Sequence, residues 1–101
     1  IRPLDRIPLN GWEIQMQCDV LYTYIRNAGI LELASLGNYE FEFSKIVEIL
    51  ANSYSLSDYE VEALLKLRTV KAQYRARQIC NFNAKTVLEI SRKVILKVFT
   101  H

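Results

Sequence analysis

The sequence predicts an all-α fold, a four-to-five-helix up-and-down bundle in a single domain. Apolar residues recur at the helical spacing of three and four in every long segment of the chain. Glycine and proline number only 3 and 2, too few for an all-β domain with many tight turns. With 101 residues, 50% of them hydrophobic, the chain has the size of one domain with a modest core.

Residues 1–9 contain both prolines, Pro3 and Pro8. We expect them to form an extended arm ahead of a single helical domain at residues 10–101. The chain begins without Met and without an apolar leader, so we expect no signal peptide and a chain that is processed, trimmed or cut from something longer. No apolar run approaches the ~18–20 residues of a membrane span, and we expect no membrane partner.

The two cysteines, Cys18 and Cys80, lie far apart in the sequence, each in apolar surroundings. Two cysteines can form one bridge, but they are not the framework of a disulfide-rich domain. We therefore expect buried free thiols in a reducing compartment, which favours a cytoplasmic protein.

The first helix is expected to begin after Asn10, which can cap it while Glu13 reaches back, as in a capping box. Its apolar stripe consists of Trp12, Met16, Val20 and Tyr24, with Leu21 and Ile25 beside them. A glycine inside a helix costs only ~1 kcal/mol. We therefore expect the helix to continue through Gly29 to near Leu36 and to stop at Gly37.

The aromatic-rich segment at residues 38–43 is expected to be a connection. Residues 40–43 alternate like a short strand, but no partner strand is expected elsewhere in the chain. The second helix is expected from Glu42 to Ala51, followed by a loop at residues 52–55. Its apolar face contains Phe43, Ile46, Val47 and Leu50.

The third helix is expected from Asp58 to about Cys80, with Ser57 and Glu60 in a capping box. Glu62 and Lys66 are spaced for an ion pair within it. Its apolar residues fall into two zones of the helical wheel, one with Val61, Leu65, Ala72, Ala76 and Ile79 and the other with Ala63, Leu67, Val70 and Tyr74. A helix that is apolar on two sides is covered on two sides, so we expect a homodimer with this helix close to the interface.

The fourth helix is expected from Ala84 to about Phe99, with Asn83 as its cap. Its wide apolar face contains Val87, Leu88, Ile90, Val94, Ile95, Val98 and Phe99. The basic residues of this segment, Lys85, Arg92, Lys93 and Lys97, lie on the opposite side.

Charge is unevenly distributed along the chain. Residues 1–65 contain 4 basic and 10 acidic residues, whereas residues 66–101 contain 9 basic residues and 1 acidic residue. Two interpretations are open. The basic half binds a polyanion, or it pairs with the acidic half inside the fold or between subunits.

A stripe of basic residues lies between the two apolar zones of the third helix. Arg68, Lys71 and Arg75 recur at spacings of three and four, and Arg77 follows them. Basic residues neutralise phosphates, and Tyr74 among them can stack on a base, although it also shares a face with core residues. These four basic residues are the predicted nucleic-acid-binding site, and the alternative is that their charges pair with acids such as Glu40, Glu42 or Glu48.

Most catalytic and metal sites are excluded by the residue types present. The one histidine is His101 at the end of the chain, so no Ser/His/Asp or Cys/His group can be assembled around it. The cysteines and this histidine are too few and too scattered for a structural zinc site. A glycine-rich phosphate loop is also missing. We therefore expect no catalytic residue, no metal and no cofactor.

Two segments carry a resemblance to a known family. Residues 43–50 read FSKIVEIL and, after a loop, residues 62–73 read EALLKLRTVKAQ. Together they resemble the core of a HEPN domain, a four- or five-helix bundle whose third long helix carries a leucine-rich stretch followed by R-x4-H. Arg68 matches the arginine of that motif, and Gln73 stands where the motif has histidine.

What the resemblance implies about activity depends on Gln73. In catalytic HEPN domains, the arginine and histidine of two subunits meet at the dimer interface and act on RNA. Gln73 cannot take or give a proton near neutral pH, so the resemblance implies a degenerate, non-catalytic member. Such a member would serve as a dimerisation or interaction domain, with RNA, another nucleic acid or a protein as its partner. The alternative is a metal-independent HEPN-type endoribonuclease or a toxin–antitoxin component.

Overall fold

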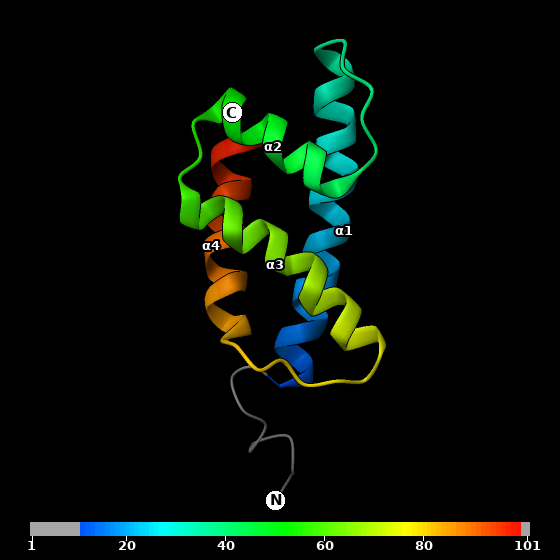
Figure 1. The fold of residues 1–101 in the computed structure, drawn as a ribbon, viewed down its shortest axis with the longest axis vertical. Helices are drawn as coiled ribbons and strands as arrows, with labels where there is room; N and C mark the ends of the chain where they lie inside the picture. Colours follow the sequence, from blue (N-terminus) through cyan, green and yellow to red (C-terminus); the bar gives the residue numbers. More distant parts are fainter. Residues whose placement is uncertain (1–10, 100–101) are drawn as a thin grey trace, which may run out of the picture.

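The computed structural model describes residues 11–99, which form four α-helices and no strand (Figure 1). The helices are α1 (Trp12–Ser35), α2 (Phe43–Tyr54), α3 (Asp58–Arg75) and α4 (Ala84–Val98). The predicted all-α bundle is confirmed. The arm expected at residues 1–9 lies outside the described residues.

The helices form two layers. In Figure 1, α1 and α4 rise side by side in the same direction, and α2 and α3 cross in front of them. The chain descends through α3, so that α1, α3 and α4 run up, down and up, while α2 crosses near the upper end. The core between the layers contains Ile25, Leu33, Ile46, Leu50, Leu64, Leu67, Val70 and Val94. No helix among residues 11–99 is long and apolar enough to cross a membrane.

The first helix continues through Gly29 and ends at Ser35, as predicted. Gly37 adopts a left-handed φ of 83°, and the Asn38 N–H donates to the Leu33 carbonyl at 2.8 Å, which closes the helix end. The capping box predicted for Asn10 and Glu13 is wrong, because Gly11 stands at the N-cap position and no side chain caps the helix. Asn10 itself lies outside the described residues.

The apolar stripe predicted for α1 does not face the core. Trp12, Met16, Val20 and Tyr24 are between 38% and 65% exposed. The buried residues of α1 are Gln15, Cys18, Ile25, Gly29 and Leu33, on the opposite side of the helix. The helix is apolar on both sides, and of the residues named with the predicted stripe, Ile25 is fully buried, on the core side.

The second helix ends three residues later than predicted, at Tyr54, so the loop expected at residues 52–55 is wrong in most of its length. The Tyr54 hydroxyl donates to Glu32 Oε2 of α1 at 2.5 Å, which holds this last turn against α1. Ser55 then adopts a left-handed φ of 55° and ends the helix.

The third helix begins as predicted and ends five residues early. The Ser57 hydroxyl accepts the Glu60 N–H at 3.4 Å, and the Ser57 N–H donates to Glu60 Oε1 at 2.8 Å, so the capping box is confirmed. The Glu62–Lys66 ion pair is also confirmed, at 3.4 Å. The helix ends at Arg75 rather than Cys80, because Arg77 takes a left-handed φ of 62°.

The fourth helix agrees with the prediction. Asn83 is its N-cap, and its side-chain oxygen accepts the N–H groups of Lys85 and Thr86 at 3.0 and 3.2 Å. The helix runs from Ala84 to Val98.

A fully buried glutamine joins α1 to the loop between α3 and α4. Gln15 Nε2 donates to the Gln78 carbonyl at 2.9 Å, and Gln15 Oε1 accepts the Cys80 N–H at 3.4 Å. The amide nitrogen and the amide oxygen of Gln15 are therefore both paired with backbone groups that are distant in the sequence. These hydrogen bonds offset the free-energy cost of burying a polar side chain.

The two cysteines are buried thiols, as predicted, and neither forms a disulfide within residues 11–99. The thiol of Cys80 donates to Gln73 Oε1 at 2.9 Å, and the thiol of Cys18 points to the Ala84 carbonyl at 3.7 Å. Burial raises the pKa of Cys18 to about 12 and also raises the pKa of Cys80. Both thiols are therefore protonated at neutral pH and are poor nucleophiles.

Candidate nucleic-acid interface

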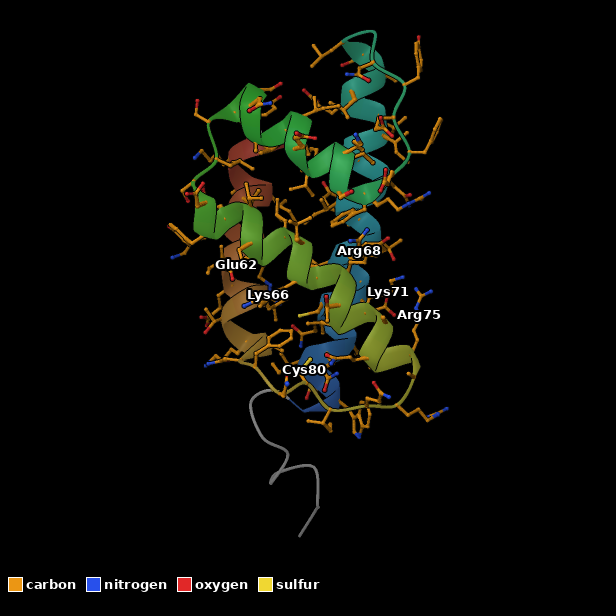
Figure 2. All side chains as sticks on the ribbon, viewed as in Figure 1. Glu62, Lys66, Arg68, Lys71, Arg75 and Cys80 are labelled. Carbon is orange, nitrogen blue, oxygen red and sulfur yellow. The ribbon has the colours of Figure 1, made fainter. Side chains whose placement is uncertain are left out.

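The predicted basic stripe forms one edge of α3. Figure 2 shows Arg68, Lys71 and Arg75 in succession along this edge, away from Glu62 and Lys66. The spacing of three and four residues places them on one face of the helix. Arg77 lies just beyond the helix end, so all four predicted residues belong to one region of the molecule.

Arg75 connects this edge to α1. Its Nε and Nη2 donate to Asp19 Oδ2 and Oδ1 at 3.2 and 3.0 Å. These bonds raise the pKa of Arg75. The Arg75 side chain is still 60% exposed, so part of its guanidinium faces solvent. Pairing with the acidic half thus occurs at this position, through Asp19 of α1.

Lys71 and Arg68 differ in their surroundings. The Lys71 ammonium lies 4.8 Å from the centroid of the Tyr22 ring on α1, and its side chain is half-buried. This cation–π contact leaves its positive charge uncompensated. Arg68 is exposed and makes no hydrogen bond or ion pair within residues 11–99.

A cleft with aromatic walls lies at the end of the basic edge. It has a volume of about 330 Å³ and is lined by Trp12, Tyr74, Arg75 and Arg77. The rings of Trp12 and Tyr74 meet edge to face, with centroids 6.1 Å apart and planes at 61°. Tyr74 is half-buried, and its ring packs on Trp12 at the rim of the bundle rather than in the core.

Trp12 was missed as a site residue because its spacing grouped it with the apolar stripe predicted for the first helix. One feature of the sequence indicates that Trp12 lies at the end of the bundle. Trp12 is the only tryptophan, and it occupies the first position of α1, where the chain enters the bundle. A large ring at the first turn of a helix lies at the end of a bundle, where less of it can be covered.

A second cleft, of about 220 Å³, lies between α3 and α4 and includes Tyr59, Lys66 and Phe82 among its lining residues. Its one cation, Lys66, is paired with Glu62 at 3.4 Å and lies 5.1 Å from the Phe82 ring centroid. This cleft therefore offers no unpaired positive charge, and Lys66 is a suitable control residue for the basic edge.

The arrangement can bind an anion but offers little to catalyse a reaction. Arginine and lysine stay protonated near neutral pH and supply charge and hydrogen-bond donors. Gln73 accepts a hydrogen bond from the Cys80 thiol, so its amide is engaged in the loop after α3. No group of three or more His, Cys, Asp or Glu side chains among residues 11–99 could hold a metal ion.

Comparison of the chain with protein-family models, with curated proteins and with solved structures found no match. The function of the chain is therefore inferred from its own residues.

Proposed function

We propose that this chain is a non-catalytic helical interaction domain that binds nucleic acid along the basic edge of α3. The observation that carries the proposal is the pair of exposed arginines, Arg68 and Arg77, neither of which has an anionic partner within residues 11–99. Arg68 lies on the edge of α3 with Lys71 and Arg75, and Arg77 follows the helix end and lines one cleft with Arg75. Unpaired cations on one edge match the spaced phosphates of a nucleic-acid backbone.

The resemblance to HEPN domains supports the same function. Arg68, the residue that matches the HEPN arginine, is exposed and unpaired among the described residues. Gln73 in place of histidine favours a degenerate HEPN-like domain that binds RNA or another nucleic acid without cleaving it. The alternative of an endoribonuclease or toxin–antitoxin component predicts RNA cleavage without metal, and a cleavage assay in EDTA distinguishes the two.

The binding test uses a double variant, Arg68→Ala/Arg77→Ala, with a fluorescently labelled oligonucleotide at several salt concentrations. Neither residue has a described structural partner, so the variant is expected to fold, as a circular dichroism melt would check. Fluorescence anisotropy is expected to show severalfold weaker binding. The slope of log K against log salt should fall by roughly 0.7 for each phosphate of a single strand that the variant no longer neutralises.

The matched control is Lys66→Ala, which removes one positive charge from the same helix but outside the basic edge. It is expected to keep the affinity of the wild type. A folded double variant with unchanged affinity and salt slope would overturn the proposed function. Lys71 and Arg75 are left intact because both contact α1, so replacing them would mix binding with folding.

A second candidate function is homodimerisation, favoured by the outward face of α1. Met16, Val20, Tyr24 and Leu31 are 43%, 65%, 46% and 72% exposed on it. They recur at spacings of four, four and seven residues, which places them on one side of the helix, where a second copy of the same face could cover them. By contrast, the apolar zone of α3 that contains Val61 and Leu65 is half-buried in its own bundle at these two residues. Beyond them, the zone exposes alanines. The apolar surface that α1 offers is therefore the larger one.

The cytoplasm remains the proposed compartment. Its support is that both cysteines carry thiols rather than a disulfide, as expected where cysteines are kept reduced.

A further inference from the structure

We infer that the cleft between Trp12 and Tyr74 binds one unpaired nucleobase of a single-stranded nucleic acid, with the flanking phosphates on Arg75 and Arg77. The inference rests on the proposed function and specifies which nucleic acid the same region takes. Its starting observation is that two aromatic rings and two guanidinium groups line one open cleft of about 330 Å³.

The aromatic surface is available at the rim of the bundle. Trp12 is 38% exposed, although it packs edge to face against Tyr74 at 6.1 Å. In an edge-to-face contact the edge of one ring covers at most one face of the other, so this contact leaves π surface uncovered. A nucleobase stacks on such a surface irrespective of its identity, because every base has a π face.

The two cations are placed differently around this surface. Arg75 donates two N–H groups to Asp19, and its side chain stays 60% exposed, so its remaining N–H groups can reach a phosphate. Arg77 is exposed, and its left-handed backbone turns the chain immediately after α3. From the cleft, Arg75, Lys71 and Arg68 continue the line of positive charge along α3.

The cleft selects against a duplex. Bases inside a double helix are stacked on their neighbours, and only an unpaired base can be inserted between side chains. The volume of the cleft lies at the lower end of the range of small-molecule sites, which suits one base rather than several. RNA and DNA share this chemistry, so the cleft itself is expected to accept an unpaired base from either.

The test uses the intrinsic fluorescence of Trp12, which reports on the cleft alone because it is the only tryptophan of the chain. The wild type is titrated with four 12-mers: oligouridylate, oligothymidylate, an abasic strand of the same charge and a blunt duplex. The two base-bearing single strands are expected to quench the fluorescence. The abasic strand and the duplex are expected to bind, by anisotropy, without quenching. A difference between the two base-bearing strands identifies RNA or DNA as the preferred ligand.

Two variants extend the test. Trp12→Ala is expected to weaken binding of the base-bearing strands by roughly 5- to 100-fold, the effect of losing one stacked base, and to leave abasic binding and the salt slope unchanged. Trp12→Phe keeps a π face and should retain part of the affinity. The wild-type titration needs no variant, so the inference stays testable even if Trp12→Ala does not fold.

The two proposals fail in different ways. Salt-dependent binding of all four ligands without any quenching, with Trp12→Ala as tight as the wild type, would overturn the base-stacking inference and leave the proposed function standing. Absence of salt-dependent binding to any of the four ligands would overturn both.

Discussion

At the scale of single residues, Ser57 and Glu60 form a complete capping box at the start of α3. We expect Ser57→Ala to lower the free energy of unfolding by about 1 kcal/mol, because the cap loses the hydroxyl that pairs with the Glu60 N–H and with the Glu60 carboxylate. Urea unfolding at neutral pH measures this loss. Ser53, an exposed serine near the end of α2 that makes no side-chain hydrogen bond within residues 11–99, is the matched control, and Ser53→Ala should cost far less.

The same capping box predicts the direction in which pH changes the stability of the fold. The hydrogen bond from the Ser57 N–H lowers the pKa of Glu60. The stabilisation is therefore fully present above the carboxyl's unfolded pKa and is lost as the pH falls through the lowered folded value. The Ser57 hydroxyl also donates to this carboxylate and also lowers its pKa, and only this bond is lost in Ser57→Ala, which keeps the backbone N–H. The difference in stability between wild type and Ser57→Ala should therefore shrink in strongly acidic solution. A difference that grew on acidification would contradict this assignment.

A close approach between α1 and α2 requires glycine at position 29. A Cβ built on Gly29 would lie 2.6 Å from Cγ2 of Ile46, a fully buried side chain. We expect Gly29→Ala to destabilise the fold by about 1–3 kcal/mol through overpacking, although alanine is the better helix former.

A double-variant cycle with Ile46→Ala tests the cause. Ile46→Ala removes the clashing methyl group, so Gly29→Ala should cost little, or even stabilise, in that background. Equal costs of Gly29→Ala in both backgrounds, measured by urea unfolding, would show that the contact with Ile46 is not responsible.

Prediction from sequence was weakest where burial depends on distant partners. Gln15 is fully buried, which its polarity does not predict, because its amide pairs with the backbone of Gln78 and Cys80. Met16 and Val20 are exposed although both are apolar. Helical periodicity finds the apolar sides of α1, but only the positions of α2, α3 and α4 determine which side is covered.

At the scale of helices, the ion pair between Asp19 and Arg75 links α1 to the basic edge of α3. The carboxylate competes with any phosphate for the same guanidinium. We expect Asp19→Asn to increase affinity for a single-stranded oligonucleotide by roughly 1.5- to 5-fold, an effect the size of one exposed ion pair. Anisotropy titration measures it, with only a small change in melting temperature.

Glu48→Gln is the control for this prediction. Glu48 is an exposed acid on α2, so the variant changes net charge by the same amount away from Arg75. Its affinity should stay close to that of the wild type. An equal increase in both variants would mean that net charge, rather than release of Arg75, governs binding.

Helix starts were more predictable than helix ends. Ser57 and Asn83 cap α3 and α4 through local hydrogen bonds, which a sequence of a few residues specifies. The end of α3 was not predictable in this way, because the left-handed residue after it is Arg77 rather than glycine. The early end brings Arg77 beside Trp12, so the cleft itself was not visible in the sequence.

At the scale of the whole molecule, the charge asymmetry is only partly compensated inside the fold. Arg75 pairs with Asp19, and Lys97 of α4 pairs with Glu60 of α3 at 3.5 Å. Arg68 and Arg77 have no such partner among the described residues. Pairing with the acidic half therefore accounts for some of the basic residues, and Arg68 and Arg77 are the residues on which the proposed polyanion binding depends.

Self-association through α1 is a prediction for the assembled protein. Wild type is expected to sediment as a dimer of the 11.8 kDa chain, and Val20→Glu/Leu31→Glu as a monomer. Both side chains are exposed, so stability should change by less than about 0.5 kcal/mol per site in the monomer. Ile79→Glu alters an exposed apolar residue outside α1 and should remain dimeric. Wild type that sediments as a monomer at high micromolar concentration would refute dimerisation, and a dimeric double variant would refute the role of α1.

The buried amide of Gln15 has a consequence for how the molecule moves. A surface loop usually fluctuates independently of the helices that it joins. Here residues 78 and 80 of the loop are bonded to a side chain in the first turn of α1, so the loop cannot lift away unless both bonds break and a buried amide loses its partners. The loop and the first turn of α1 therefore open as one cooperative unit. Trp12 lies in that turn and Arg77 directly precedes the loop residues, so the walls of the cleft keep their spacing through the fast fluctuations of the chain.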